Sequence, residues 1–247
     1  MKPDKKNQVM ELSWDRVAIR IEAGATAILP LGAGAKEHGF HLPMNTDQIQ
    51  AEWLAARIAS EIDALVWPTL TYGYYPAFVN YAGSVTLSAK TFKAVLSDIL
   101  TGLIGFGLRD VLVIDTGIST IKPVAEIMAA PEFSGKAHHL KVHEGPRYAK
   151  AVKELCEQTS GSHADELETS RMLALAPGVV DMRKAKPSPP GKGGGRAPLT
   201  PFDAASINYS PSGSWGDPTL ASQEKGDPLL AAMAEDVMEM ARRSLAP

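Results

Sequence analysis

Hydrophobic residues along the chain form short continuous runs that alternate with longer stretches in which they recur every three or four residues. The continuous runs have the length of buried strands and cover residues 26–31, 64–67, 111–115 and 140–143. The spaced stretches indicate amphipathic helices over residues 14–22, 46–62, 88–106, 121–130, 147–157, 165–176 and 227–245. Strands that alternate with helices favour a mostly parallel sheet covered on both faces. The pattern therefore predicts an α/β fold, a three-layer α/β/α single domain over residues 1–247.

Regular structure is not expected between Pro187 and Pro218, where 13 of 32 residues are proline or glycine. Loops of this length in compact domains are commonly lids, binding loops or disordered segments. A flexible excursion is one interpretation of this loop. The other is that it orders against a partner surface through its aromatic and polar side chains, which are Phe202, Asn208, Tyr209 and Trp215.

Charge and hydropathy narrow the range of partners. The chain carries 25 Lys and Arg against 28 Asp and Glu, a formal net charge of −3, whereas neutralising nucleic-acid phosphates requires a clustered excess of basic residues. The most apolar stretch, residues 25–35, is shorter than the roughly 20 residues that span a bilayer. No apolar segment of the signal-peptide type follows the early lysines. We therefore expect no nucleic-acid partner, no membrane association and a cytoplasmic location.

Cys156 is the one cysteine of the sequence, which excludes an intramolecular disulfide and a cysteine-based zinc site. No basic residue flanks it to lower its pKa, so a small core residue is favoured over a nucleophile. Any metal must then bind through His, Asp or Glu. Three of the histidines, His138, His139 and His143, fall in a polar connection and a strand edge, where surface exposure is expected.

Ligand-type side chains gather in residues 34–47, directly after the first predicted strand. Ligands of open α/β sheets bind beyond the carboxyl ends of the strands, and this segment contains Glu37, His38, His41 and Asp47, which are donors suited to Zn²⁺ or Mn²⁺. At a helix start, the helix dipole also favours ionised Asp47. The alternative is that Asp47 only caps the helix and that one histidine only hydrogen-bonds the loop.

The sequence resembles the signature of the creatininase (creatinine amidohydrolase) family. The resemblance lies in LPLG at residues 29–32, EHGFHLPMNTD at 37–47, AGSVTL at 82–87, HADELETSRMLA at 163–174, GDPTLA at 216–221 and EKG at 224–226. The resemblance implies a single α/β domain with a two-metal centre near the strand ends. It further implies hydrolysis of a cyclic amide or another C–N bond, and a homo-oligomer, in this family a hexamer.

Carried over residue by residue, His38 resembles a metal ligand and Asp47 the carboxylate that bridges both metals. His163 resembles the histidine that moves a proton to the leaving nitrogen, a task suited to imidazole with its ordinary pKa of about 6.5. Glu168 resembles the acidic residue of the following helix. Ser162 and Asp165 form an S-x-x-D capping pattern, which predicts His163 at the exposed start of that helix; an ordinary first-turn residue is the alternative.

The chain departs from the family pattern at two places. Where the family has the glutamate of Glu-x-His, this chain has Lys36, and Glu37 is adjacent to His38 instead. Where the family has Asn-Gly-His-x-Glu after the third strand, this chain reads DTGIST at residues 115–120, so both ligands of that motif are absent. The expected metal ligands are therefore Glu37, His38 and Asp47, with Asp115 or His41 as possible additions, and one Zn²⁺ or Mn²⁺ is expected rather than two.

Lys36 suggests a metal-free alternative, because an ammonium group can balance Asp47 and polarise a carbonyl. In that case Asp47, Glu168 and His163 perform acid–base chemistry, Lys36 stabilises the developing oxyanion, and Ser119 or Thr116 binds polar groups of the substrate. A solvated loop lysine is the plain alternative.

The leading hypothesis is a metal-dependent hydrolase of creatininase type, acting on a C–N (cyclic amide) or related carbonyl bond of a small polar molecule. Its catalytic residues are His163, Glu168 and Lys36. The alternatives are a metal-free hydrolase or isomerase that uses Lys36, and a catalytically silent subunit that binds a small molecule.

Overall fold

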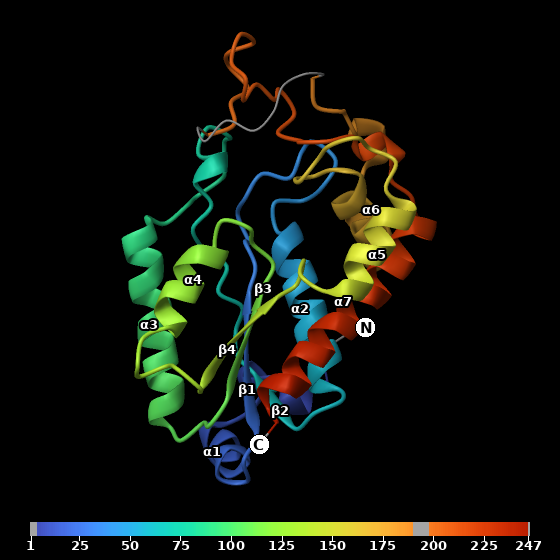
Figure 1. The fold of residues 1–247 in the computed structure, drawn as a ribbon. Coiled ribbons are helices and arrows are strands. Elements are labelled where there is room, and N and C mark those ends of the chain that lie inside the picture. Colours follow the sequence, from blue (N-terminus) through green and yellow to red (C-terminus); the bar gives the residue numbers. More distant parts are fainter. Residues whose placement is uncertain (1–3, 190–197, 247) are drawn as a thin grey trace.

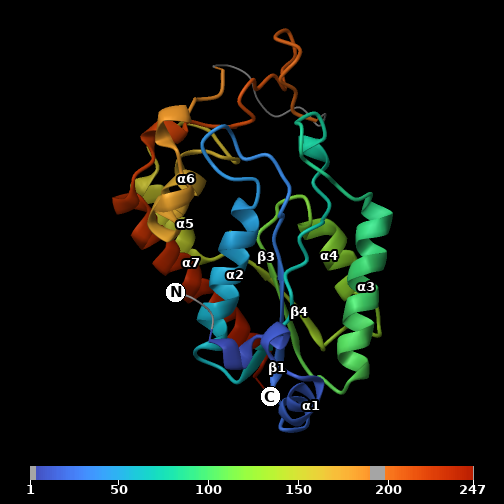
Figure 2. The same cartoon turned by 180° about the vertical axis from the view of Figure 1, so that it is seen from behind.

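A four-stranded parallel sheet forms the centre of the computed structural model, which describes residues 4–189 and 198–246. Its order is β2 (Ala64–Val66), β1 (Thr26–Leu31), β3 (Val111–Asp115) and β4 (Ala137–Lys141), and each neighbouring pair is parallel. Figure 1 shows the sheet between two groups of helices, and Figure 2 shows the same layers from behind. The predicted three-layer α/β/α arrangement is confirmed.

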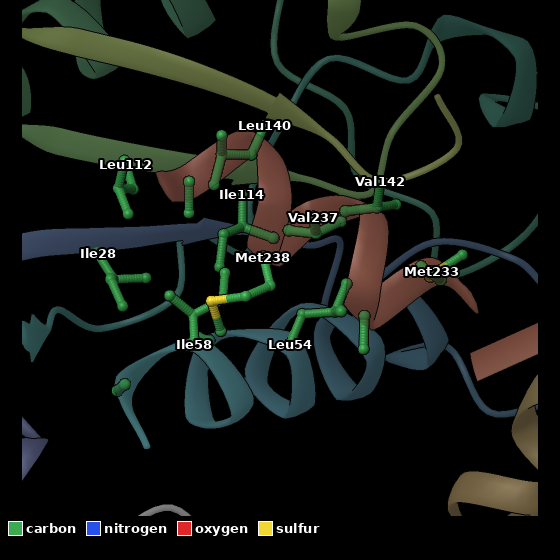
Figure 3. Close-up of a cluster of buried hydrophobic side chains, with 14 of the residues drawn as sticks. Ile28, Leu54, Ile58, Leu112, Ile114, Leu140, Val142, Met233, Val237 and Met238 are labelled. Carbon is green, nitrogen blue, oxygen red and sulfur yellow. The ribbon is translucent and has the colours of Figure 1, made fainter. Parts of the chain in front are cut away.

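Alternation along the strands distributes their side chains between the two helical layers, since successive residues of a strand point to opposite faces. Ala27, Leu29 and Val113 pack on the face covered by α3 (Ala89–Gly105) and α4 (Ile121–Met128). Ile28, Leu112 and their neighbours face the layer of α2 (Thr46–Ala59), α5 (Pro146–Leu155) and α7 (Gln223–Ser244). Figure 3 shows this second cluster, in which side chains of α2 and α7 meet those of the sheet.

Two further helices complete the fold. α6 (Glu166–Leu175) packs on α7, and α1 (Trp14–Glu22) lies at the end of the molecule opposite the site described below. None of the helices in the described residues is both long enough and apolar enough to cross a membrane.

The predicted bounds hold closely for most elements, but β4 and α7 differ. β4 pairs with β3 from Ala137 to Lys141, whereas residues 140–143 were expected, because polar His138 and His139 interrupt the hydrophobic run at this edge of the sheet. α7 begins at Gln223 rather than at residue 227. Ser222 caps it by accepting from the Lys225 N–H at 3.3 Å, and the helix contains Pro228.

The proline- and glycine-rich loop is described except for residues 190–197, which lie outside the described residues. From 198 to 217 it contains no α-helix or strand, as expected. Several of its polar residues are nevertheless buried. Tyr81, for example, donates from its hydroxyl to the Ser210 carbonyl at 2.7 Å. This part of the loop is therefore packed against the body of the protein.

Candidate active site

A cavity of about 610 Å³ opens beyond the carboxyl ends of β1 and β3, where an open α/β sheet binds its ligands. Segments that are far apart in sequence line it, including residues 31–36, 73–78, 115–120 and 161–168 and the side chains of Asp47, Tyr148, Arg171 and Trp215.

The polypeptide after β1 is folded tightly against the start of α2. A side chain at Gly32 would place its Cβ 2.6 Å from the Asp47 carbonyl oxygen, so the close approach of the two segments requires glycine there. Gly39 has a φ of +71°, and its N–H donates to the Glu37 carboxylate. This compact loop brings Lys36 and His38 against Asp47, and Lys36 to the cavity wall.

Lys36 and Asp47 form a buried ion pair, with Lys36 Nζ 2.6 Å from Asp47 Oδ2. Burial favours the neutral amine, but Asp47 and Glu168 outweigh it and hold the pKa of Lys36 above its ordinary value. Burial likewise disfavours the Asp47 carboxylate, yet Lys36 and His38 lower its pKa. The ammonium also lies 4.9 Å from the centre of the Phe78 ring. The alternative of a solvated loop lysine is therefore wrong, because Lys36 is buried and paired.

Two histidines direct a ring nitrogen toward one carboxylate. His38 Nδ1 lies 2.9 Å from the Lys36 carbonyl oxygen, and His38 Nε2 lies 3.2 Å from Asp47 Oδ1. His163 Nε2 lies 2.9 Å from the Glu37 carbonyl oxygen, and its Nδ1 faces Glu168. His38 Nε2 and His163 Nδ1 lie 4.0 Å and 3.7 Å from the two oxygens of Glu168. Among the described residues, His38, His163 and Glu168 form the one group able to hold a metal ion, with ligand atoms within 4.8 Å of one another.

The charged groups of this cluster shift one another's pKa values. Burial alone raises the pKa of Glu168, but His38 and His163 lower it to about 2. Burial opposes protonation of His163, whereas the Glu37 carboxylate, with Oε2 3.2 Å from Nε2, raises its pKa above the ordinary value. Burial also disfavours the charged form of Glu37, and contact with His163 reverses that effect and lowers its pKa.

His163 lies before α6 rather than in its first turn. Its side chain is 7% exposed, and its backbone pairs with Trp215 of the proline- and glycine-rich loop. The helix is capped by Asp165, which accepts from the Glu168 N–H at 3.0 Å. The prediction that Ser162 caps the helix and leaves His163 exposed is therefore wrong, because the cap lies three residues later and the chain turns inward at Ala164, where φ is +44°.

Other candidates are engaged elsewhere. His41 Nε2 lies 2.8 Å from Thr169 Oγ1, and burial lowers the pKa of His41 to about 4, so it remains neutral outside the metal-capable group. Asp115 accepts from the Gly117 N–H and the Thr120 hydroxyl and contacts His139 Nε2 at 2.9 Å.

The histidines of the β4 region differ from the expectation. His138, His139 and His143 are partly buried and lie against Asp110, Asp115 and the Thr116 carbonyl respectively, so the predicted surface exposure is wrong for all three. Burial raises the pKa of the Cys156 thiol. A raised pKa disfavours the thiolate, in line with the prediction that Cys156 is no nucleophile.

The sequence reasoning missed three buried residues that surround the cluster. Gln50 Nε2 lies 3.3 Å from Glu168 Oε1, and Arg171 and Tyr148 follow it along the cavity wall. Gln50 precedes Leu54 by four residues and so lies on the apolar face of α2. A polar residue at such a position is the signal that could have identified it.

The comparisons with known proteins identify the family of this chain. The model of the creatininase family, described as creatinine amidohydrolase, matches residues 10–241. The chain belongs to the creatininase family. The creatinine amidohydrolase of Pseudomonas putida is 25% identical over 260 residues, which cover 97% of each chain. The mycofactocin precursor peptide peptidase of Mycobacterium tuberculosis (strain ATCC 25618 / H37Rv) is 25% identical over 235 residues, 87% of this chain and 84% of the relative.

Solved structures of creatininases share the fold. A structure titled "Creatininase Mn" has a TM-score of 0.81 and 25% identity over 98% of this chain and 99% of its own. A creatininase variant titled "Zn-Zn type" has a TM-score of 0.80 and 26% identity over 97% and 98%. The family thus includes amidohydrolases whose structures carry Mn or Zn.

The residues present here fit a divalent ion. Two imidazole nitrogens and a carboxylate oxygen are a common donor set for Zn²⁺ and suit Mn²⁺ as well. Each histidine places its other ring nitrogen against a carbonyl oxygen, the arrangement that fixes the orientation of metal-binding histidines. Glu37 and Asp47, two of the three predicted ligands, are not in the group itself. Glu37 lies against His163, whereas Asp47 lies against Lys36 and 3.2 Å from His38 Nε2.

Proposed function

We propose that this chain is a metal-dependent hydrolase that cleaves a C–N bond of a cyclic amide, or a related carbonyl bond, in a small polar molecule. The supporting observation is the convergence of ring nitrogens of His38 and His163 on Glu168, beside a buried lysine and next to a cavity. Relatives named for creatinine and for a precursor peptide both act on carbonyl–nitrogen bonds, which favours the same bond class here.

One ion is proposed, held by His38, His163 and Glu168. When bound, a divalent ion supplies Lewis-acid chemistry, which polarises a carbonyl and acidifies water. Asp47 holds Lys36 at the cavity wall, and Glu37 orients His163. The Lys36 ammonium donates to the carbonyl oxygen of the substrate and stabilises negative charge that develops there. The aromatic residues Tyr75, Phe78 and Trp215 line the cavity and limit the access of water.

Elemental mass spectrometry on protein purified without chelators tests the metal site. We expect about one equivalent of Zn or Mn in the wild type, and its loss in His38→Gln and Glu168→Gln. His139→Gln is the matched control, since this histidine contacts Asp115 outside the group, and it should retain the ion. Equal metal content in all four proteins would contradict the assignment.

The buried Lys36–Asp47 pair favours a second candidate, metal-free hydrolysis or isomerisation. A turnover screen over cyclic amides, lactones and cyclic ketones separates the possibilities. The second candidate is supported if the metal-free wild type turns over a substrate and the Lys36→Met variant does not. Background rates in wild type and in all variants would support the third possibility, a subunit that only binds a small molecule.

A further inference from the structure

Arg171 is a buried cation without a carboxylate partner. The residue is 3% exposed, and no carboxylate oxygen of the described residues lies within 4.0 Å of its guanidinium group. Arg57 and Arg147, by contrast, are half-exposed and pair with Glu61 and Asp236. Burying a charge without an opposite charge beside it is unfavourable, so a buried arginine at a cavity favours an anionic ligand there.

The arginine has donors that the protein does not use. Nε donates to Gln50 Oε1 at 2.8 Å, and Nη1 donates to the Tyr148 hydroxyl. No described residue accepts from Nη2, and this nitrogen is not sealed within the protein, because Arg171 lines the cavity. Tyr148, which also lines the cavity, accepts from Arg171, and its own hydroxyl proton has no acceptor among the described residues. Two adjacent donors are thus available to one ligand.

The surroundings of these donors leave space. The small residues Thr116, Gly117 and Ser119, which follow β3, also line the cavity. Four carboxylates, those of Asp47, Asp115, Asp165 and Glu168, line the same cavity. Burial lowers the pKa of nearby His143, with a further contribution from Arg171, so this imidazole is neutral. Lys36, the other lysine or arginine along the described cavity wall, is balanced by Asp47. Arg171 is therefore the lysine or arginine of the described cavity wall that has no carboxylate within 4.0 Å.

We propose that Arg171, assisted by Tyr148, binds a carboxylate of the substrate, which makes the substrates small carboxylic acids that also contain the scissile carbonyl bond. This inference rests on the proposed function for the reaction centre. A planar guanidinium matches the two oxygens of a carboxylate and binds them more strongly than a neutral group. Gln50 joins Arg171 to Glu168 through one side chain, so the carboxylate and the scissile bond lie close together in a compact molecule.

Isothermal titration calorimetry with matched acid and amide pairs tests this assignment. The probes are 5-oxoproline, succinate and hydantoin-5-acetate, each compared with its neutral carboxamide. We expect at least one acid to bind the wild type tenfold or more tightly than its amide. Arg171→Gln should abolish the preference, and Arg171→Lys should retain part of it because the charge remains. Arg57→Gln, which removes an arginine outside the cavity, should keep the full preference.

The proposal is overturned if no acid of the panel binds the wild type, if acids and amides bind equally, or if Arg171→Gln keeps the preference. Should Arg171→Gln not fold, an Arg171→Lys variant with an unchanged preference overturns it as well. The titrations require no turnover and are repeated after chelation. The protein could show a preference for acids that depends on Arg171 and yet hold no metal and hydrolyse no substrate. That result would refute the proposed function but support the anion site.

Discussion

At the scale of single residues, the site is defined by buried charges that neutralise one another. Lys36 and Asp47 are each below 10% exposed, and each loses its closest opposite charge if the other is replaced. Removing one partner of such a pair leaves an uncompensated buried charge, whereas removing both does not. The pair can therefore be tested through stability alone, without a known substrate.

We expect Lys36→Met to lower the free energy of unfolding by about 3–5 kcal/mol. The double variant Lys36→Met/Asp47→Asn should recover much of that loss, because no charge is then left unpaired. Chemical denaturation in the presence of a chelator measures both, so that metal binding does not contribute. A loss below about 1 kcal/mol in the single variant, or additive losses in the double variant, would show that the two groups do not depend on each other.

At the scale of elements, the contact between α6 and α7 is close because of one glycine. A Cβ at Gly226 of α7 would overlap the Ser170 carbonyl oxygen and lie 2.8 Å from Ala174 Cβ. Gly102 of α3, by contrast, has nothing within 4 Å of such a Cβ. Helix propensity alone predicts that Gly→Ala stabilises a helix by about 0.5–1 kcal/mol. At Gly226, packing therefore determines whether Gly→Ala raises or lowers the free energy of unfolding.

Gly102→Ala should raise the free energy of unfolding, and Gly226→Ala should lower it by about 1–3 kcal/mol through overpacking. Urea denaturation of the two variants beside the wild type measures the difference in sign. If both variants are stabilised, the separation between α6 and α7 is not fixed by Gly226.

Most elements were predictable because hydrophobic spacing is local. The spacing of Leu54 and Ile58, for example, is sufficient to place α2. The family motifs likewise indicated His38, His163 and Glu168 as site residues. The contacts were not predictable, because the His163–Glu37 pair joins residues 126 positions apart and its geometry depends on the whole fold. Arg171 was not predicted as a site residue for the same reason, since its burial follows from the packing of α6 and not from its neighbours in sequence.

At the scale of the whole molecule, one buried carboxylate joins three helices of the same layer. Glu166, at the start of α6, accepts from the Gln158 N–H at 2.7 Å just beyond α5 and from Lys225 Nζ of α7 at 2.6 Å. Burial alone raises the pKa of Glu166, but these donors outweigh it and lower the pKa below its ordinary value of 4.5. Acid therefore weakens the connection between the helices.

The sign of the pH dependence follows from this lowered pKa. A carboxyl group with a lower pKa in the folded state contributes stability above its unfolded pKa, and that contribution is lost as the pH falls through the folded value. We expect Glu166→Gln to lower the free energy of unfolding at neutral pH, and the gap to the wild type to narrow below about pH 4.5. Glu126→Gln is the control, because Glu126 pairs with Lys93 on the surface and such exposed pairs contribute little to stability. Denaturant unfolding between about pH 7 and pH 3 measures the three curves. A constant gap between wild type and Glu166→Gln would show that ionised Glu166 does not hold these helices together.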